Sequence, residues 1–188
     1  MTLISSGNEQ VKAEVVYRVL DNEHIKDNCE FIDTEFHDDD NIYIQAKAGI
    51  IPDNDLFIYF SIPQNTPNIF ITISDGDSDL VQKIIGNVEQ KDVKNPSYFT
   101  KKKVVRYENQ ELNRRGVFGI VLLPLSVSGI LDSMEETFEF ANKEYSFQLV
   151  TMLSKTEIEL WEKDGFENLM EFFDSTDKDL LSFEQRLS

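Results

Sequence analysis

The sequence predicts a single α+β domain in which one mixed β-sheet is flanked by helices near both ends of the chain. The length of 188 residues fits one domain and is enough to bury a sizeable core. Runs rich in aromatic and β-branched residues, typical of strands, recur through the chain, and apolar residues recur at helical spacing near both ends. We expect residues 1–22 to form an N-terminal helix of this domain, residues 23–176 its α+β body, and residues 177–188 a tail or short helix.

The first third of the chain predicts one helix followed by strands. Asn8 is a candidate N-cap for a helix over residues 9–20, in which Val11, Val15 and Val19 recur at helical spacing. After a break at residues 21–24, strands are expected over residues 29–36, 42–46, 56–62 and 69–73. Turns rich in Asp, Asn and Pro separate them.

The middle of the chain gives weaker signals. Residues 80–85 fit either a strand or a helix, because the apolar run is short. Residues 86–110 are polar, and we expect loops there with at most one short strand over residues 104–107. Residues 116–123 predict a buried strand that ends at Pro124, and residues 130–139 predict an acidic connection with at most one helical turn.

The clearest local pattern lies near the C-terminus. Residues 145–153 predict a strand, and Ser154 with Glu157 forms the sequence of a capping box, which starts a helix directly after it. Gly165 is placed to end that helix, before a second apolar helix. Four aromatic residues of this segment are expected in the core rather than on a recognition surface: Trp161, Phe166, Phe172 and Phe173.

The charge of the chain restricts its partners. The formal net charge is −17, from 35 acidic and 18 basic residues. Such a charge repels nucleic acid and anionic membranes and attracts a basic protein or a cation, although it also fits a role in solubility alone. Cys29 is the single cysteine, which fits a reducing compartment, and no apolar run reaches the length of a membrane span or signal peptide. We therefore expect a cytoplasmic protein whose partner is another protein, with no nucleic acid and no membrane.

An acidic segment follows the strand over residues 69–73 and is the first candidate site. Alternate carboxylates can supply the oxygen ligands of a calcium ion. However, Leu80 and Gly86 stand where a calcium loop needs its turn glycine and its bidentate glutamate, so a solvated turn is favoured and no metal or other cofactor is expected. The segment consists of Asp75, Gly76, Asp77, Ser78 and Asp79.

Other catalytic patterns are weak. His24 and His37 lie thirteen positions apart, which is not a zinc-site spacing, and no signature of an activated nucleophile surrounds Cys29. The sequence contains no nucleophile elbow, phosphate-binding glycine loop or dinucleotide fingerprint. The basic run at Lys101, Lys102 and Lys103 is short and predicts an exposed loop rather than a nucleic-acid patch. We expect no catalytic residue.

Several of these stretches, in order, resemble the suppressor of fused family. In that family a strand leads into a loop similar to residues 74–79, in which Gly76, Ser78 and Asp79 match. A late strand, a polar turn, an acid-containing helix and a glycine before an apolar helix also match, here at residues 147–153, 155–157 and 163–165. The resemblance covers residues 23–174.

This resemblance implies a mixed-sheet protein-binding domain rather than an enzyme, with the segment at residues 75–79 as the expected binding site. Animal members hold zinc-finger transcription factors, whereas bacterial members are similar to immunity proteins. For an acidic single-domain chain, the resemblance implies an immunity protein that neutralises a basic toxin domain by occlusion. The alternative left open is a metal-assisted hydrolase that uses Asp75, Asp77 and Asp79.

Overall fold

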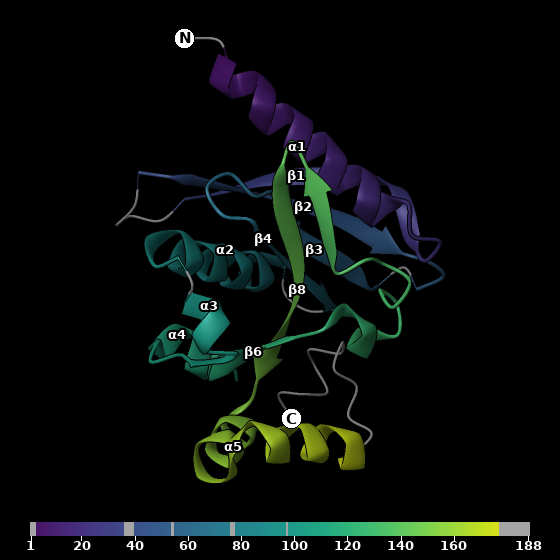
Figure 1. The fold of residues 1–188 in the computed structure, drawn as a ribbon. Coiled ribbons are helices and arrows are strands. Elements are labelled where there is room, and N and C mark those ends of the chain that lie inside the picture. Colours follow the sequence, from purple (N-terminus) through teal and green to yellow (C-terminus); the bar gives the residue numbers. More distant parts are fainter. Residues whose placement is uncertain (1–2, 36–39, 54, 76–77, 97, 177–188) are drawn as a thin grey trace.

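The computed structural model describes residues 3–35, 40–53, 55–75, 78–96 and 98–176. These residues form one α+β domain built on a mixed sheet, which confirms the predicted fold class (Figure 1). The strands are β1 (Ile25–Glu35), β2 (Ile42–Ile50), β3 (Phe57–Ser61), β4 (Asn68–Ser74), β5 (Val104–Arg106), β6 (Gly119–Leu123), β7 (Thr137–Phe140) and β8 (Lys143–Leu153). The helices are α1 (Leu3–Leu20), α2 (Ser78–Lys94), α3 (Tyr98–Lys101), α4 (Gln110–Arg114), the 3-10 helix η1 (Leu125–Ser128) and α5 (Lys155–Thr176).

Strand β8 pairs with three other strands and connects the two parts of the sheet. The strand order is β1-β2-β3-β4-β8-β6-β5, and β7 pairs with the first half of β8. β8 runs parallel to β4 and antiparallel to both β6 and β7, so the long strand joins an antiparallel N-terminal meander to the later strands. β1 and β5 form the two ends of the sheet in this order.

Alternating residues of the central strands enter two separate apolar clusters, because successive side chains of a strand point to opposite faces. In β3, Ile58 and Phe60 belong to one cluster and Tyr59 to the other. In β4, Ile71 and Phe70 divide in the same way. The sheet therefore buries both of its faces.

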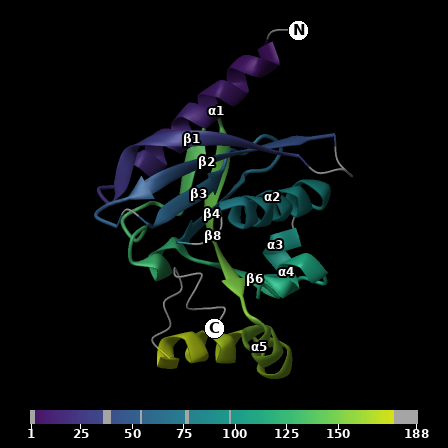
Figure 2. The ribbon, with the colours of Figure 1, turned by 180° about the vertical axis from the view of Figure 1, so that it is seen from behind.

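The helices divide between these faces. α1 contributes Val11, Val15 and Val19, and α5 contributes Leu169 and Phe173, to the cluster on one face, which we call the α1/α5 face. The cluster on the other face, the α2 face, contains four buried apolar residues of the first half of α2: Leu80, Val81, Ile84 and Ile85. Figures 1 and 2 show α2, α3 and α4 stacked together on one side, with α1 and α5 toward opposite ends of the molecule.

Two helical predictions need correction. α1 begins at Leu3, so Asn8 lies inside the helix and does not cap it. The prediction of loops over residues 86–110 is wrong over residues 98–101, which form α3, and over residues 86–94, because α2 continues to Lys94. Its second half buries Glu89 and Asp92, and these polar residues hide the apolar periodicity of a buried helix.

The acidic connection predicted over residues 130–139 is also wrong at its end, where β7 begins at Thr137. β7 and β8 form a hairpin in which Phe140 pairs with Lys143 across two residues, Ala141 and Asn142, which both have positive φ. Two-residue hairpin loops with positive φ at both positions match the twist of the strands.

The C-terminal pattern is confirmed. The Ser154 backbone N–H donates to Glu157 Oε2 at 2.6 Å, and the Glu157 N–H donates to Ser154 Oγ at 3.4 Å, as in a capping box. Gly165 has φ 87° and ψ −178° and separates two helical parts of α5. Phe173 is buried, while Trp161, Phe166 and Phe172 are partly buried and pack against the core. The tail over residues 177–188 lies outside the described residues.

Among the helices of the described residues, none combines the length and apolarity needed to cross a bilayer.

Candidate functional site

The structure places the acidic candidate segment at the junction of β4 and α2. Asp75 is exposed directly after β4, whereas Ser78 and Asp79 already belong to the first turn of α2. The Ser78 hydroxyl accepts a hydrogen bond from the Gln82 amide at 2.7 Å. Gly76 and Asp77 lie outside the described residues. A carboxylate in the first helical turn, such as that of Asp79, is stabilised by the partial positive charge of the helix N-terminus.

Asp79 lies on the wall of an open groove of about 660 Å³, which we call the acidic groove. The groove lies between the end of β1, the first half of α2 and the segment around α4, three regions that are far apart in the sequence. Its carboxylates come from all three: Asp33, Glu35, Asp79 and Glu111.

The acidic groove has an excess of negative charge. Counted over the described residues, its four carboxylates face two basic residues, Lys83 and Arg115, which gives a formal charge of −4 + 2 = −2. Lys83 pairs with Glu111 at 3.9 Å, and both side chains are more than half exposed. Exposed ion pairs are worth little, because water and salt screen both charges. These side chains are therefore available to reorient toward a charged partner.

Hydrogen bonds behind the groove hold its walls in place. The Gln45 amide, fully buried in β2, donates to the Thr34 hydroxyl at 3.1 Å and to the Gln82 carbonyl at 2.8 Å. These two bonds connect β1 and α2 through β2. On the third wall, Asn109 Oδ1 accepts from the N–H groups of Glu111 and Leu112 and caps α4. The acidic side chains thus project from a fixed backbone.

The described residues that line the groove offer mainly charged and amide side chains. None of these described residues is a histidine or a cysteine. In the described part of the chain, no three His, Cys, Asp or Glu side chains gather in a way that could hold a metal ion. The arrangement suits the recognition of a basic surface.

The other sequence candidates lie elsewhere. Cys29 is partly buried in β1, and burial raises the pKa of its thiol, an effect that the charge of Lys12 partly opposes. A raised pKa lowers the fraction of reactive thiolate. His24 faces Glu23 at 3.8 Å in the turn after α1, and His37 lies outside the described residues.

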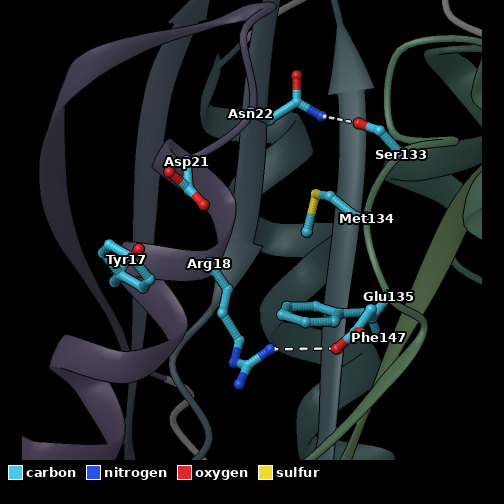
Figure 3. A pocket seen from close by; sticks show the side chains of 8 residues that line it. All are labelled: Tyr17, Arg18, Asp21, Asn22, Ser133, Met134, Glu135 and Phe147. Carbon is cyan, nitrogen blue, oxygen red and sulfur yellow. Dashed lines mark hydrogen bonds and ion pairs between the residues drawn. The ribbon is translucent and has the colours of Figure 1, made fainter.

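A smaller pocket of about 230 Å³ lies where the end of α1 meets the segment before β7 (Figure 3). Arg18 pairs with Glu14 at 2.7 Å and with Glu135 at 3.5 Å. The Asn22 amide donates to Ser133 Oγ at 3.3 Å and to the Ile130 carbonyl at 3.0 Å. These contacts dock α1 on the body of the domain, so we assign the pocket a structural role.

Sequence reasoning found Asp79 but missed Asp33, Glu35 and Glu111. The only signal for them is a surplus of acids at the end of β1 and before α4, which is common in a chain with 35 acidic residues. The end of β1 and the segment around α4 lie near Asp79 only because α2 packs on the sheet between them, and the local sequence does not show this packing.

No family model matches the chain, and no curated protein matches it. Its fold is similar to that of a crystal structure described as a SUFU (suppressor of fused protein) homolog from Neisseria gonorrhoeae FA 1090. The TM-score is 0.67 at 16% sequence identity, over 93% of this chain and 94% of the other. This likeness shows that the fold is suppressor of fused-like, as the sequence resemblance implied.

Proposed function

We propose that this chain is a non-enzymatic binding module that recognises another protein through the acidic groove. The observation that carries the proposal is the convergence of Asp33, Glu35, Asp79 and Glu111, from three separate regions, on one groove of a chain with charge −17. The suppressor of fused-like fold supports it, because the sequence resemblance to that family implies binding rather than catalysis.

The partner that fits is a basic protein surface. Complementary charge increases the rate of encounter and orients the partner, while contacts around the groove supply most of the affinity. A groove of about 660 Å³ accommodates a short basic loop or the end of a helix. A stable complex also needs roughly 800 Å² of each surface, so the partner must cover the surroundings of the groove.

The specific form that we propose is an immunity protein that neutralises a toxin. A toxin that acts on nucleic acid needs a basic surface for its substrate. An acidic module bound to that surface blocks the substrate by occupying its place, and no chemical step is required of the module.

The test is capture of partners from host-cell lysate on the immobilised chain, with a charge-neutralised variant beside it. The quadruple variant D33N/E35Q/D79N/E111Q removes the carboxylates of the groove. The matched control E139Q/E144Q/E167Q/E171Q removes the same number of charges from exposed positions of β7, β8 and α5. We expect wild type and the control to retain a basic protein that the groove variant loses.

The captured protein is then expressed alone and together with this chain. Growth arrest by the partner, relieved by wild type but not by the groove variant, is the result expected of an immunity protein. A partner that the groove variant retains equally contradicts the site, and the absence of any basic partner contradicts the function.

The hydrolase alternative is tested separately by melting curves with added magnesium or calcium ions. A ligand that binds only the folded state raises the melting temperature. A saturable increase that disappears in D75N/D77N/D79N would favour the hydrolase alternative, whereas unchanged melting is expected here.

A further inference from the structure

A second groove, of about 630 Å³, lies at the β5 end of the sheet, between α3, β5 and α5. We call it the basic–aromatic groove. It shares no lining residue with the acidic groove. The residues that give it its character are Lys101, Lys102, Lys103, Arg106, Trp161 and Phe166.

The charge of this groove is opposite to that of the chain. Among the described residues, four of the 18 basic residues of the chain line it together with a single carboxylate, Glu162. Its formal charge over these residues is +4 − 1 = +3, against −17 for the whole chain. Glu162 pairs with Arg106 at 2.5 Å, and this hydrogen bond raises the pKa of the guanidinium. Lys101, Lys102 and Lys103 are exposed, and no ion pair joins them to a carboxylate of the described residues. Three positive charges therefore remain for a ligand.

Aromatic rings stand beside these charges. The Lys102 ammonium lies 5.6 Å from the centroid of the Tyr98 ring, and the Lys103 ammonium lies 5.7 Å from that of Phe166. These distances are within the range of cation–π attraction. Trp161 and Phe166 are only partly buried. The groove thus combines an apolar wall with cations along its rim.

We propose that the basic–aromatic groove binds an acidic peptide segment that carries one bulky apolar side chain. The carboxylates of the segment pair with the three lysines, and its single apolar side chain packs against Trp161, over whose ring no cation of the described residues lies. A single-stranded nucleic acid fits less well, because bases need free ring faces for stacking and ammonium groups already lie over Tyr98 and Phe166. The overall charge of −17 also opposes a polyanion more strongly than a short peptide.

Trp161 provides a direct measurement, because it is the only tryptophan of the chain and it lines the groove. The probe is a synthetic glutamate-rich peptide of about ten residues with one central leucine, a length that spans such a groove when extended. We expect a saturable change in Trp161 fluorescence that weakens as salt is raised from about 50 to about 500 mM, because salt screens the charges. Binding should weaken when the leucine is replaced by alanine and disappear when the glutamates are replaced by lysines.

The test variant is K101Q/K102Q/K103Q, whose changes are all at exposed positions, so that folding is preserved and can be checked by circular dichroism. We expect about tenfold weaker binding, as the loss of three exposed charge pairs implies. The matched control K94Q/K143Q/K155Q removes the same charge from exposed positions that line neither groove, and it should bind within about twofold of wild type, as for other surface changes remote from a site.

Equal binding by the two triple variants, or no saturable signal with the acidic peptide, overturns the proposal. So does tighter binding of an oligothymidylate than of the peptide, which would mark a nucleic-acid site. A protein-concentration-dependent dimer that masks Trp161 would instead identify a second copy of this chain as the occupant. None of these results bears on the acidic groove, since the two grooves are altered by different substitutions.

Discussion

The two faces of the sheet bury different kinds of side chain. The α1/α5 face is an apolar cluster that runs from Val11 to Phe173. The α2 face has an apolar centre but also buries several polar groups. All buried side-chain atoms without a hydrogen-bond partner, among the described residues, belong to residues in or against this layer: Gln45, Tyr59, Glu89, Asp92 and Tyr107.

This difference indicates that the two faces contribute differently to the stability of the domain. A buried polar atom without a partner costs about 1–3 kcal/mol, so the α2 face gives up stability that the α1/α5 face retains. The acidic groove also lies on the α2 side, where Asp79 and Lys83 project from the same helix. We infer that the α1/α5 face contributes more to the stability of the domain, while the α2 side carries the groove proposed for recognition.

The largest effect should come from a cavity in the α1/α5 face. Phe60→Ala removes a fully buried ring from β3 and should lower the free energy of unfolding by about 3–5 kcal/mol. The neighbouring residue Tyr59 points to the α2 face, where its hydroxyl has no partner. Tyr59→Phe should therefore be neutral or stabilising by about 1 kcal/mol. Urea unfolding measures both, and similar losses in the two variants would contradict the contrast between the faces.

The next effect concerns Glu89 in α2. Burial, and to a smaller extent the negative charge of Asp92, raise the pKa of Glu89 to about 8. The folded protein therefore keeps a proton on Glu89 that the unfolded chain releases once the pH exceeds the ordinary value of 4.5. The resulting loss of stability is absent below pH 4.5, grows as the pH rises to about 8, and is constant above that.

Glu89→Gln should remove this pH dependence, because a neutral amide has no proton to lose. Each unit of pKa shift corresponds to about 1.4 kcal/mol, so the variant should gain up to several kcal/mol over wild type at pH 8 and little at pH 4.5. Denaturant unfolding across this range is the measurement, with the exposed Glu111→Gln as the control. Parallel curves for wild type and E89Q would show that Glu89 is ionised in the folded state.

A smaller effect should separate the helix caps on the two sides. Ser154→Ala removes one half of the capping box of α5, which packs Ile158 and Leu169 into the α1/α5 face, and should cost about 1 kcal/mol. Asn109→Ala removes the cap of α4, a five-residue helix with no fully buried residue. Its loss should remain local and appear as faster amide exchange of Glu111 and Leu112 rather than as a change in global stability. An equal global loss in both variants would contradict this distinction.

The α5 cap also shows what the sequence predicts well. Ser154 and Glu157 act within four residues, and strands such as β3 and β4 carry aromatic and β-branched residues without interruption, so local patterns identify them. The second half of α2 was missed because buried Glu89 and Asp92 interrupt its apolar spacing. β7 was missed because it is only four residues long and directly follows the acidic pair Glu135 and Glu136.

The sites depend on contacts that no local pattern contains. Asp79 was identified from its own segment, but its groove also needs Glu35 and Glu111, which only the packing of α2 on the sheet brings near. Likewise, Lys101 and Trp161 are sixty residues apart in the sequence. They line the same groove because α5, which begins directly after β8, lies beside β5 in the fold. The only sequence signal for the basic–aromatic groove was the short run Lys101–Lys103. That run predicted an exposed loop and gave no indication of a groove.

The smallest expected effect tests whether Asp79 belongs to the structure or to the acidic groove. Asp79 lies in the first turn of α2, where a negative charge is worth about 0.3–1 kcal/mol at low salt. Asp79→Asn should therefore reduce stability by about 0.5 kcal/mol, and about 0.5 M salt should remove most of the difference, since the interaction is screened. Lys83→Gln, one helical turn later and also exposed, should change stability by less than about 0.5 kcal/mol in either direction. Because the predicted loss from D79N is small, a strong loss of partner binding in the same variant would assign its carboxylate to recognition on the α2 face.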